Sequence, residues 1–214
     1  VRVVGPRLRR SERHRYTRIR AGDFWTGNRS RLPFMPVLPL RHLPDPVLRQ
    51  RTRRIRLNGV SVERFVDDMF ETMHAEHGVG IAANQIGSLM RVAVIEIPIE
   101  MLPHQDPAEE TDGEVEEEDV EQPEPQRYVL INPEIVRRVG EREVDEGCLS
   151  IPGWRGRVTR SERVTARALD LEGREFRIRA EGLLAQALEH ETDHLNGIVY
   201  IDRVTRVEDL WSLE

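Results

Sequence analysis

The chain has 214 residues and a formal net charge of −6, and its hydrophobic fraction of 38% is enough to bury a core in one domain. No apolar run approaches the roughly 18 residues of a membrane span, and a single cysteine without a secretory segment favours a reducing cytoplasm. The net acidity does not indicate a substrate, because charge is concentrated in the segments 1–34 and 100–126.

Residues 1–34 carry ten Arg and two acidic residues and show neither helical nor strand periodicity. Such a segment fits a nucleic-acid-binding arm or an organelle transit peptide, although it has few serines and no amphipathic period. Met35 then opens a proline-rich stretch. We interpret 1–34 as a disordered basic extension or as sequence upstream of a misassigned start codon. We expect no direct nucleic-acid specificity and place the folded domain at 35–214.

An extended, proline-punctuated segment is expected at 37–57, followed by a helix. Ser61 is a candidate N-cap, and Gly78 is the expected end. The apolar residues between them recur at helical spacing and predict a buried stripe, which makes both methionines core residues: Val62, Phe65, Val66, Met69, Phe70 and Met73.

The stretch Gly78–Gln85 combines two glycines with small apolar residues. Glycine lets the backbone approach a ligand closely, and a neutral amide such as Gln85 can donate a hydrogen bond to a developing oxyanion. The glycines neither follow a strand nor complete G-x-G-x-x-G, so we exclude a dinucleotide site. Taken alone, the stretch also fits a loop with a packing role.

Strands alternate with polar segments over the next 90 residues. Residues 100–126 carry twelve acidic residues and scarcely any hydrophobic ones, which predicts a disordered acidic insertion, either passive or a tether for a basic partner. Strands are predicted at 91–97 and at 128–131, the second ending in a turn at Asn132-Pro133. Residues 135–139 and 143–144 are predicted to form a strand pair around Gly140. Residues 164–169 and 174–179 are predicted to form a hairpin.

Cys148 is the only cysteine and lies in Glu146-Gly147-Cys148-Leu149-Ser150. A lone thiol forms no intramolecular disulfide, so it is either a small buried hydrophobe or a functional group.

Residues 181–197 are predicted as a helix, because leucine and alanine recur at helical spacing and Asn196-Gly197 supplies a stop. Within it, His190-Glu191-Thr192-Asp193-His194 fits H-E-x-x-H. Residues i and i+4 share a helix face, so His190 and His194 can aim at one point while Glu191 reaches a metal-bound water. The alternative is an amphipathic helix with two surface histidines. Cys148 as third ligand would leave one tetrahedral position open, as in catalytic metal sites. The predicted fold class is α+β, with small antiparallel sheets around this central helix and one further helix packed outside.

Three motifs together resemble peptide deformylase. Gly78–Gln85 matches the family's G-φ-G-φ-A-A-x-Q, Glu146–Ser150 matches E-G-C-φ-S and His190–His194 matches H-E-x-x-H, in the family's order. The resemblance covers roughly 35–99 and 127–203, so 35–214 would be the catalytic domain. The acidic insertion is the clearest departure, since the family usually connects the flanking strands more briefly.

The resemblance implies an enzyme that removes the formyl group from the N-formylmethionine of nascent polypeptides and releases formate. It implies metal ligation by Cys148, His190 and His194, proton transfer by Glu191, and stabilisation of the oxyanion by Gln85 and the backbone N–H of Leu149. Gly80 would bind the peptide backbone, and Arg155 would lie near the peptide entrance. The methionine pocket would be lined by Ile81, Ile86, Leu149, Gln186 and Ala187; Gln186 is polar where the family commonly has an aliphatic residue.

The resemblance also implies ferrous iron as the metal in the cell, with Zn²⁺ or Ni²⁺ able to substitute, and a cytoplasmic enzyme that associates with the ribosome and not with membranes. The short acidic tail after Asp202 does not favour a basic ribosome-docking helix.

Two other classes remain open. An H-E-x-x-H metallopeptidase usually takes its third ligand downstream of the helix, where Glu208 and Glu214 are the glutamates available. A non-catalytic binding module with the same fold is the other, and the retained Glu191, Gln85 and Cys148 argue against it.

Overall fold

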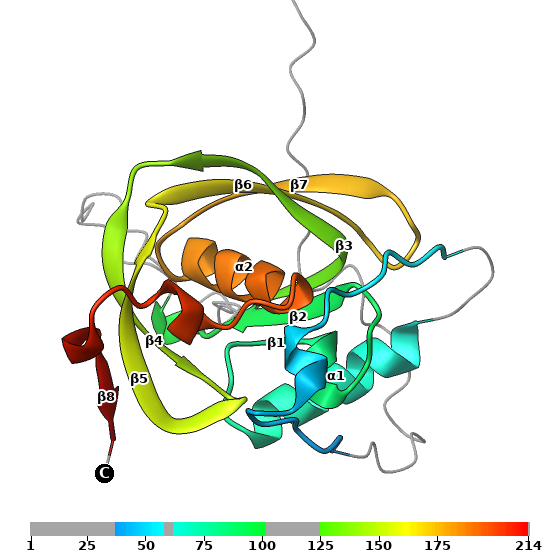
Figure 1. The fold of residues 1–214 in the computed structure, drawn as a ribbon. Coiled ribbons are helices and arrows are strands. Elements are labelled where there is room, and N and C mark those ends of the chain that lie inside the picture. The colour runs from blue at the N-terminus through cyan, green and yellow to red at the C-terminus, as the bar shows by residue number, and fades with distance from the viewer. Residues whose placement is uncertain (1–36, 58–61, 102–124, 214) are drawn as a thin grey trace, which may run out of the picture.

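A computed structural model describes residues 37–57, 62–101 and 125–213 (Figure 1). Over these residues the chain forms two antiparallel sheets and two α-helices, which confirms the predicted α+β class. No helix in the described part of the chain is long and apolar enough to cross a membrane. The predicted basic extension 1–34 lies outside the described residues, as does the acidic insertion 100–126 except for its ends, so both remain predictions.

The larger sheet has five strands in the order β1-β2-β3-β6-β7, and the smaller has three in the order β4-β5-β8. Their bounds are β1 Gly80–Ala82, β2 Val92–Ile97, β3 Gln126–Val139, β4 Arg142–Cys148, β5 Ile151–Arg160, β6 Arg163–Leu169, β7 Glu175–Glu181 and β8 Leu210–Ser212. The predicted hairpin is β6 and β7. The larger sheet curves around helix α2 (Gly182–Leu195), as Figure 1 shows, so α2 is the central helix that the sequence predicted.

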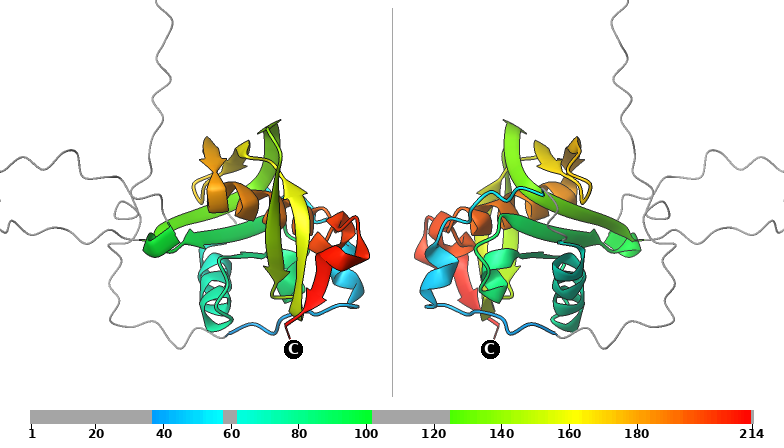
Figure 2. Two further views of the ribbon diagram at one scale, coloured as in Figure 1. Left: turned by 90° about the vertical axis from the view of Figure 1, so that its left-hand side faces the viewer. Right: turned by 90° about the vertical axis from the view of Figure 1, so that its right-hand side faces the viewer.

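Strand β2 separates two hydrophobic clusters. Side chains alternate across a strand, so Ala93, Ile95 and Ile97 pack with the apolar face of α2. Val92 and Val94 face the other way and pack with helix α1 (Glu63–Ala75). The side views in Figure 2 place the two helices on opposite sides of this strand. Both faces of the sheet are therefore buried at its centre.

Helix α1 has the predicted buried stripe, since Val66, Met69 and Met73 are at most 2% exposed. Neither predicted end of this helix was confirmed. Val62 occupies the N-cap position without a side-chain hydrogen bond, and Ser61 lies outside the described residues. The helix ends at Ala75, and the residue with left-handed backbone is His77 (φ 55°) rather than Gly78.

The predicted turn at Asn132-Pro133 was also wrong, because β3 continues through it. The register of β3 against β6 shifts between Ile131 and Glu134, and Asn132 takes the left-handed conformation (φ 54°) that asparagine tolerates better than most residues. Its side chain accepts from the N–H of Ile55 at 2.9 Å and donates to the carbonyl of Ile55 at 2.8 Å. A bulge, fixed by a distant segment, replaces the turn.

The predicted strand pair around Gly140 does not form. Strand β3 pairs with β6 and β4 pairs with β5, so the chain changes sheets at Gly140, whose φ is +70°. This crossing carries β4 over α2 and brings Cys148, at the end of β4, to the helix. Strand β8, which the sequence analysis did not predict, adds three residues to the far edge of β5.

Candidate metal centre

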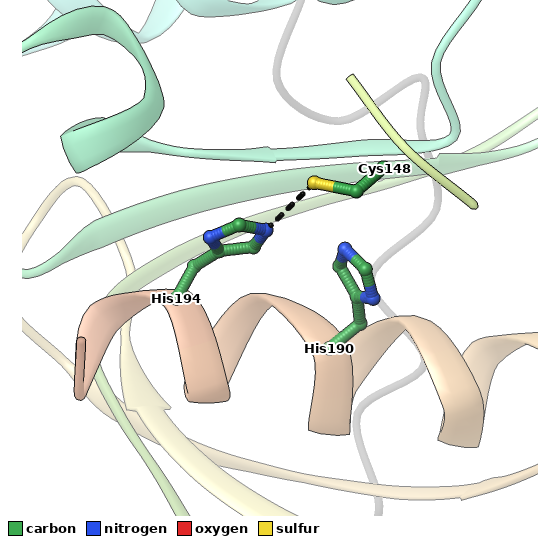
Figure 3. A group of neighbouring side chains, drawn as sticks. All are labelled: Cys148, His190 and His194. Atoms are coloured by element: carbon green, nitrogen blue, oxygen red, sulfur yellow. Dashed lines mark hydrogen bonds between the residues drawn. The ribbon is translucent and has the colours of Figure 1, made fainter. Parts of the chain in front are cut away.

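Cys148, His190 and His194 converge on one point (Figure 3). Their ligand atoms all lie within 4.8 Å of one another, and the Sγ atom of Cys148 is 3.1 Å from Nε2 of His194. This is the one cluster of three or more potential metal ligands in the part of the chain that the structure describes. The structure thus brings together the three residues that the sequence predicted as ligands.

Each ligand is positioned by its secondary structure. His190 and His194 are one helical turn apart on α2, so both rings leave the same face. The register of β4 against β5 shifts between Gly147 and Cys148, and this irregularity turns the thiol toward the helix. The N–H of Ser150 lies 3.4 Å from the sulfur and helps to hold it there.

The donor set suits a divalent metal. Burial would raise the pKa of the Cys148 thiol, but His194 and His190 hold that pKa well below its ordinary value, which favours the thiolate that binds metals. The Nδ1 atom of His190 lies 2.9 Å from Oε2 of Glu146, so Nε2 is left to face the cluster. One thiolate and two imidazoles leave a fourth tetrahedral position for water or substrate.

Glu191 is a buried carboxyl beside this cluster. Glu191 is 4% exposed, and its Oε2 has no hydrogen-bond partner among the described residues. Burial raises the pKa of Glu191 to about 7 despite the opposing effect of His190 and His194. A carboxyl with such a pKa can both accept and donate a proton near neutral pH.

Two residues of the glycine-rich stretch complete the site. A Cβ atom on Gly80 would lie 2.6 Å from Oε1 of Glu191, so only glycine leaves room for the carboxyl. The side-chain oxygen of Gln85 accepts from the N–H of Ala82 at 2.8 Å. This bond fixes the amide so that its Nε2 lies 3.5 Å from the sulfur of Cys148 and 3.2 Å from the hydroxyl of Ser150.

A groove of about 380 Å³ opens onto the cluster. Of the residues predicted to bind substrate, it is lined by Gly80, Leu149, Arg155, Gln186 and Ala187. Ile81 and Ile86, which were also predicted, do not line this groove and pack in the core against α1. Ile81 follows Gly80 on a strand and so points to the opposite face.

Six apolar residues of the groove were not predicted from the sequence: Val79, Ile151, Pro152, Trp154, Leu183 and Leu213. Helical spacing could have found Leu183, since residues 183, 186, 187 and 190 share one face of α2. Trp154 and Leu213 line the same groove because β8 pairs with β5, and no local pattern in the sequence indicates that pairing.

The comparisons agree with this geometry. The sequence model of the family described as "Polypeptide deformylase" matches residues 37–209. The chain is 46% identical to a peptide deformylase of Thermomicrobium roseum, over 75% of this chain and 81% of the relative. It is 42% identical to a peptide deformylase of Dehalococcoides mccartyi (strain CBDB1), over 84% of this chain and 93% of the relative.

Solved structures give the same result. A crystal structure of a peptide deformylase from Synechococcus elongatus in complex with actinonin has a TM-score of 0.67 at 37% identity, covering 83% of this chain and 85% of that one. A peptide deformylase from Legionella pneumophila has a TM-score of 0.64, also at 37% identity, covering 81% and 89%. The chain therefore belongs to the peptide deformylase family, metal-dependent hydrolases that remove the formyl group from the N-terminus of nascent polypeptides.

Proposed function

We propose that Cys148, His190 and His194 hold the metal ion of this deformylase, and that Glu191 and Gln85 carry out the chemistry beside it. The observation that carries this proposal is the placement of a buried carboxyl, with one oxygen unpartnered, next to three ligand atoms within 4.8 Å of one another. A divalent ion bound there supplies Lewis acidity and lowers the pKa of water to roughly 7.

Glu191 is the proposed proton carrier. As a carboxylate it accepts a proton from the attacking water, and as an acid it returns that proton to the amine nitrogen when the C–N bond of the formamide breaks. Water adds to the formyl carbon, and the products are formate and a free amine. A pKa of about 7 suits both halves of this transfer, because neither protonation state is strongly disfavoured near neutral pH.

Gln85 and the N–H of Leu149 are the proposed donors to the oxygen of the formyl group as it gains negative charge. Gln85 is 1% exposed, and its own oxygen is occupied by Ala82, so only its NH₂ group can turn toward the substrate. A donor that is already oriented spends little energy on reorganisation, which is how oxyanion sites work.

The groove fits an extended peptide. Strand β1 has β2 on one side only, so its other edge, which includes Gly80, can pair with a substrate strand. Leu149, Gln186 and Ala187 are the proposed contacts of the methionine side chain, and Gln186 is tied to the carbonyl of Asp145 at 3.3 Å. Arg155 is exposed at the groove and has no ion-pair partner among the described residues, so it is free to bind a substrate carbonyl.

Fe²⁺ is the proposed ion in the cell, on the strength of the family resemblance, and the same donors also accept Zn²⁺ or Ni²⁺. The proposed location is the cytoplasm, where nascent chains arise at the ribosome. The proposed catalytic domain is 35–214.

A metallopeptidase with Glu208 as third ligand is the alternative. The side chain of Glu208 is 69% exposed and lies 3.7 Å from Arg206, away from the cluster. The test compares Cys148→Ala with Glu208→Ala, measuring metal content and formate release from formyl-Met-Ala-Ser. We expect Cys148→Ala to lose both and Glu208→Ala to keep both; the reverse pattern would overturn the ligand assignment.

A further inference from the structure

A buried arginine that does not line the groove contacts two carboxylates beside the metal cluster. The side chain of Arg160 is 2% exposed, and its guanidinium donates two hydrogen bonds to the Glu146 carboxylate, from Nε to Oε1 at 2.8 Å and from Nη2 to Oε2 at 2.9 Å. Its remaining nitrogen, Nη1, lies 2.5 Å from Oδ2 of Asp193. One guanidinium therefore binds two buried carboxylates.

Both carboxylates sit next to the proposed metal ligands. Glu146 is on β4, two residues before Cys148, and its Oε2 lies 2.9 Å from Nδ1 of His190. Asp193 is on α2, immediately before His194. Arg160 is the last residue of β5, so it links the strand and the helix that carry the ligands.

Stability alone does not account for this arrangement. Taking charges out of water costs several kcal/mol per ion, and buried ion pairs are often no more stabilising than apolar residues of the same volume. The Glu146 carboxylate receives two nitrogens of Arg160 on one side and faces Nδ1 of His190 on the other, so its orientation is fixed by both. A carboxylate that accepts the hydrogen bond from Nδ1–H of His190 orients the ring and makes Nε2 a stronger ligand for a metal ion.

We propose that Arg160 is a positioning residue for the metal site. It holds the plane of the Glu146 carboxylate, which sets the rotation of the His190 ring, while its third nitrogen on Asp193, a carboxylate that Arg203 also binds, anchors the guanidinium to α2. This inference rests on the proposed metal site, but its test reads metal binding without any substrate, so a failure of the deformylase assignment would leave it untouched.

The structure supplies a matched control. Arg203 also binds Asp193, through two nitrogens, but does not contact Glu146. Lysine at either position keeps the charge and loses the planar fork. Arg160→Lys should therefore release the Glu146 carboxylate, whereas Arg203→Lys should leave it in place.

The experiment measures the affinity of the metal-free full-length protein for Co²⁺ by chelator competition under anaerobic conditions, together with the cobalt absorption spectrum. Arg160→Lys should weaken Co²⁺ binding about 10- to 100-fold, the range for lost partners of metal-ligating histidines, and should alter the spectrum. Arg203→Lys should stay within a few-fold of the wild type. A wild-type affinity and spectrum in a folded Arg160→Lys variant would overturn the proposal, as would an equal loss in both variants.

A second variant covers the case in which Arg160→Lys does not fold. Glu146→Gln keeps the shape of the side chain but cannot accept both nitrogens of the fork, so it should weaken Co²⁺ binding by a similar factor. Where Arg160→Lys does fold, the Arg160→Lys/Glu146→Gln double variant should bind Co²⁺ no more weakly than Glu146→Gln alone, because Arg160 acts through Glu146. If the two substitutions weakened Co²⁺ binding by independent factors that multiply in the double variant, Arg160 would not act through Glu146. An unchanged affinity in Glu146→Gln would overturn the proposal.

Discussion

Gly80→Ala tests the packing between the glycine-rich stretch and the proposed proton carrier. The new Cβ would lie 2.6 Å from Oε1, 3.0 Å from Cδ and 3.1 Å from Cγ of Glu191, where ordinary contact begins at 3.4 Å. The carboxyl must therefore move by about 0.8 Å, in a site where Glu191 is only 4% exposed. A displacement of about 1 Å at a reacting group can cost about 100-fold in rate.

We expect Gly80→Ala to lower kcat for formyl-Met-Ala-Ser about 100-fold, and to lower the free energy of unfolding by about 1–3 kcal/mol through overpacking. Metal content should remain one per chain, because the three atoms nearest to the new Cβ all belong to Glu191 and none to a proposed ligand. The assays are formate release, metal analysis and urea unfolding.

Gly147→Ala is the matched control. Gly147 lines the same groove, its φ is not positive, and the nearest atom to a new Cβ is Cγ of Arg155 at 3.8 Å, an ordinary contact. We expect kcat and stability close to those of the wild type. A metal-replete Gly80→Ala variant with wild-type kcat would refute the reasoning, since Glu191 could then move without loss of rate.

Three further predictions concern single residues. Gln85→Leu should lower kcat about 100- to 1,000-fold at unchanged metal content, because it removes a donor to the oxyanion; formate-release kinetics that keep kcat would exclude this role. In the metal-free protein, Glu191→Gln should be more stable than the wild type at pH 8 by about 3 kcal/mol, since the folded pKa of about 7 lies above the ordinary 4.5. The protonated carboxyl contributes this stability fully below pH 4.5 and loses it as pH rises through about 7. Urea unfolding should therefore show the difference in stability between Glu191→Gln and the wild type shrinking toward about pH 4. Equal stability of the two proteins at about pH 8 would be inconsistent with a raised pKa of Glu191. Asn132→Ala should lower the free energy of unfolding by about 3 kcal/mol, from two lost hydrogen bonds and the left-handed backbone, while Asn132→Gly should lose about 1 kcal/mol less; an Ala variant as stable as the wild type in urea would contradict this.

The central part of the site could be predicted because its signals are local. The spacing of His190 and His194 fixes a common helix face once the period of α2 is recognised, and Cys148 is the single thiol available. The buried face of α1 follows from spacing in the same way. Such patterns depend on the geometry of one element and need no knowledge of its neighbours.

The errors came from properties that only the assembled fold decides. The pairing of β4 with β5 rather than β3 depends on where the chain changes sheets, and the bulge at Asn132 depends on Ile55, 77 residues away. Ile81 is the exception, because alternation along the strand alone places it on the face opposite to Gly80, which lines the groove. The contacts of Arg160 with Glu146 and Asp193 span 14 and 33 residues, so no local pattern could indicate them.

Formate release by the protein purified anaerobically with Fe²⁺ tests the central claim most directly, with Glu191→Gln measured beside the wild type at equal metal content. The account predicts steady release of formate from formyl-Met-Ala-Ser by the wild type, and its loss in the variant while one metal per chain remains bound. Release that persists in a metal-replete Glu191→Gln variant would contradict the proposed role of this buried carboxyl, and no release from a folded, metal-replete wild type would contradict the assignment of the site.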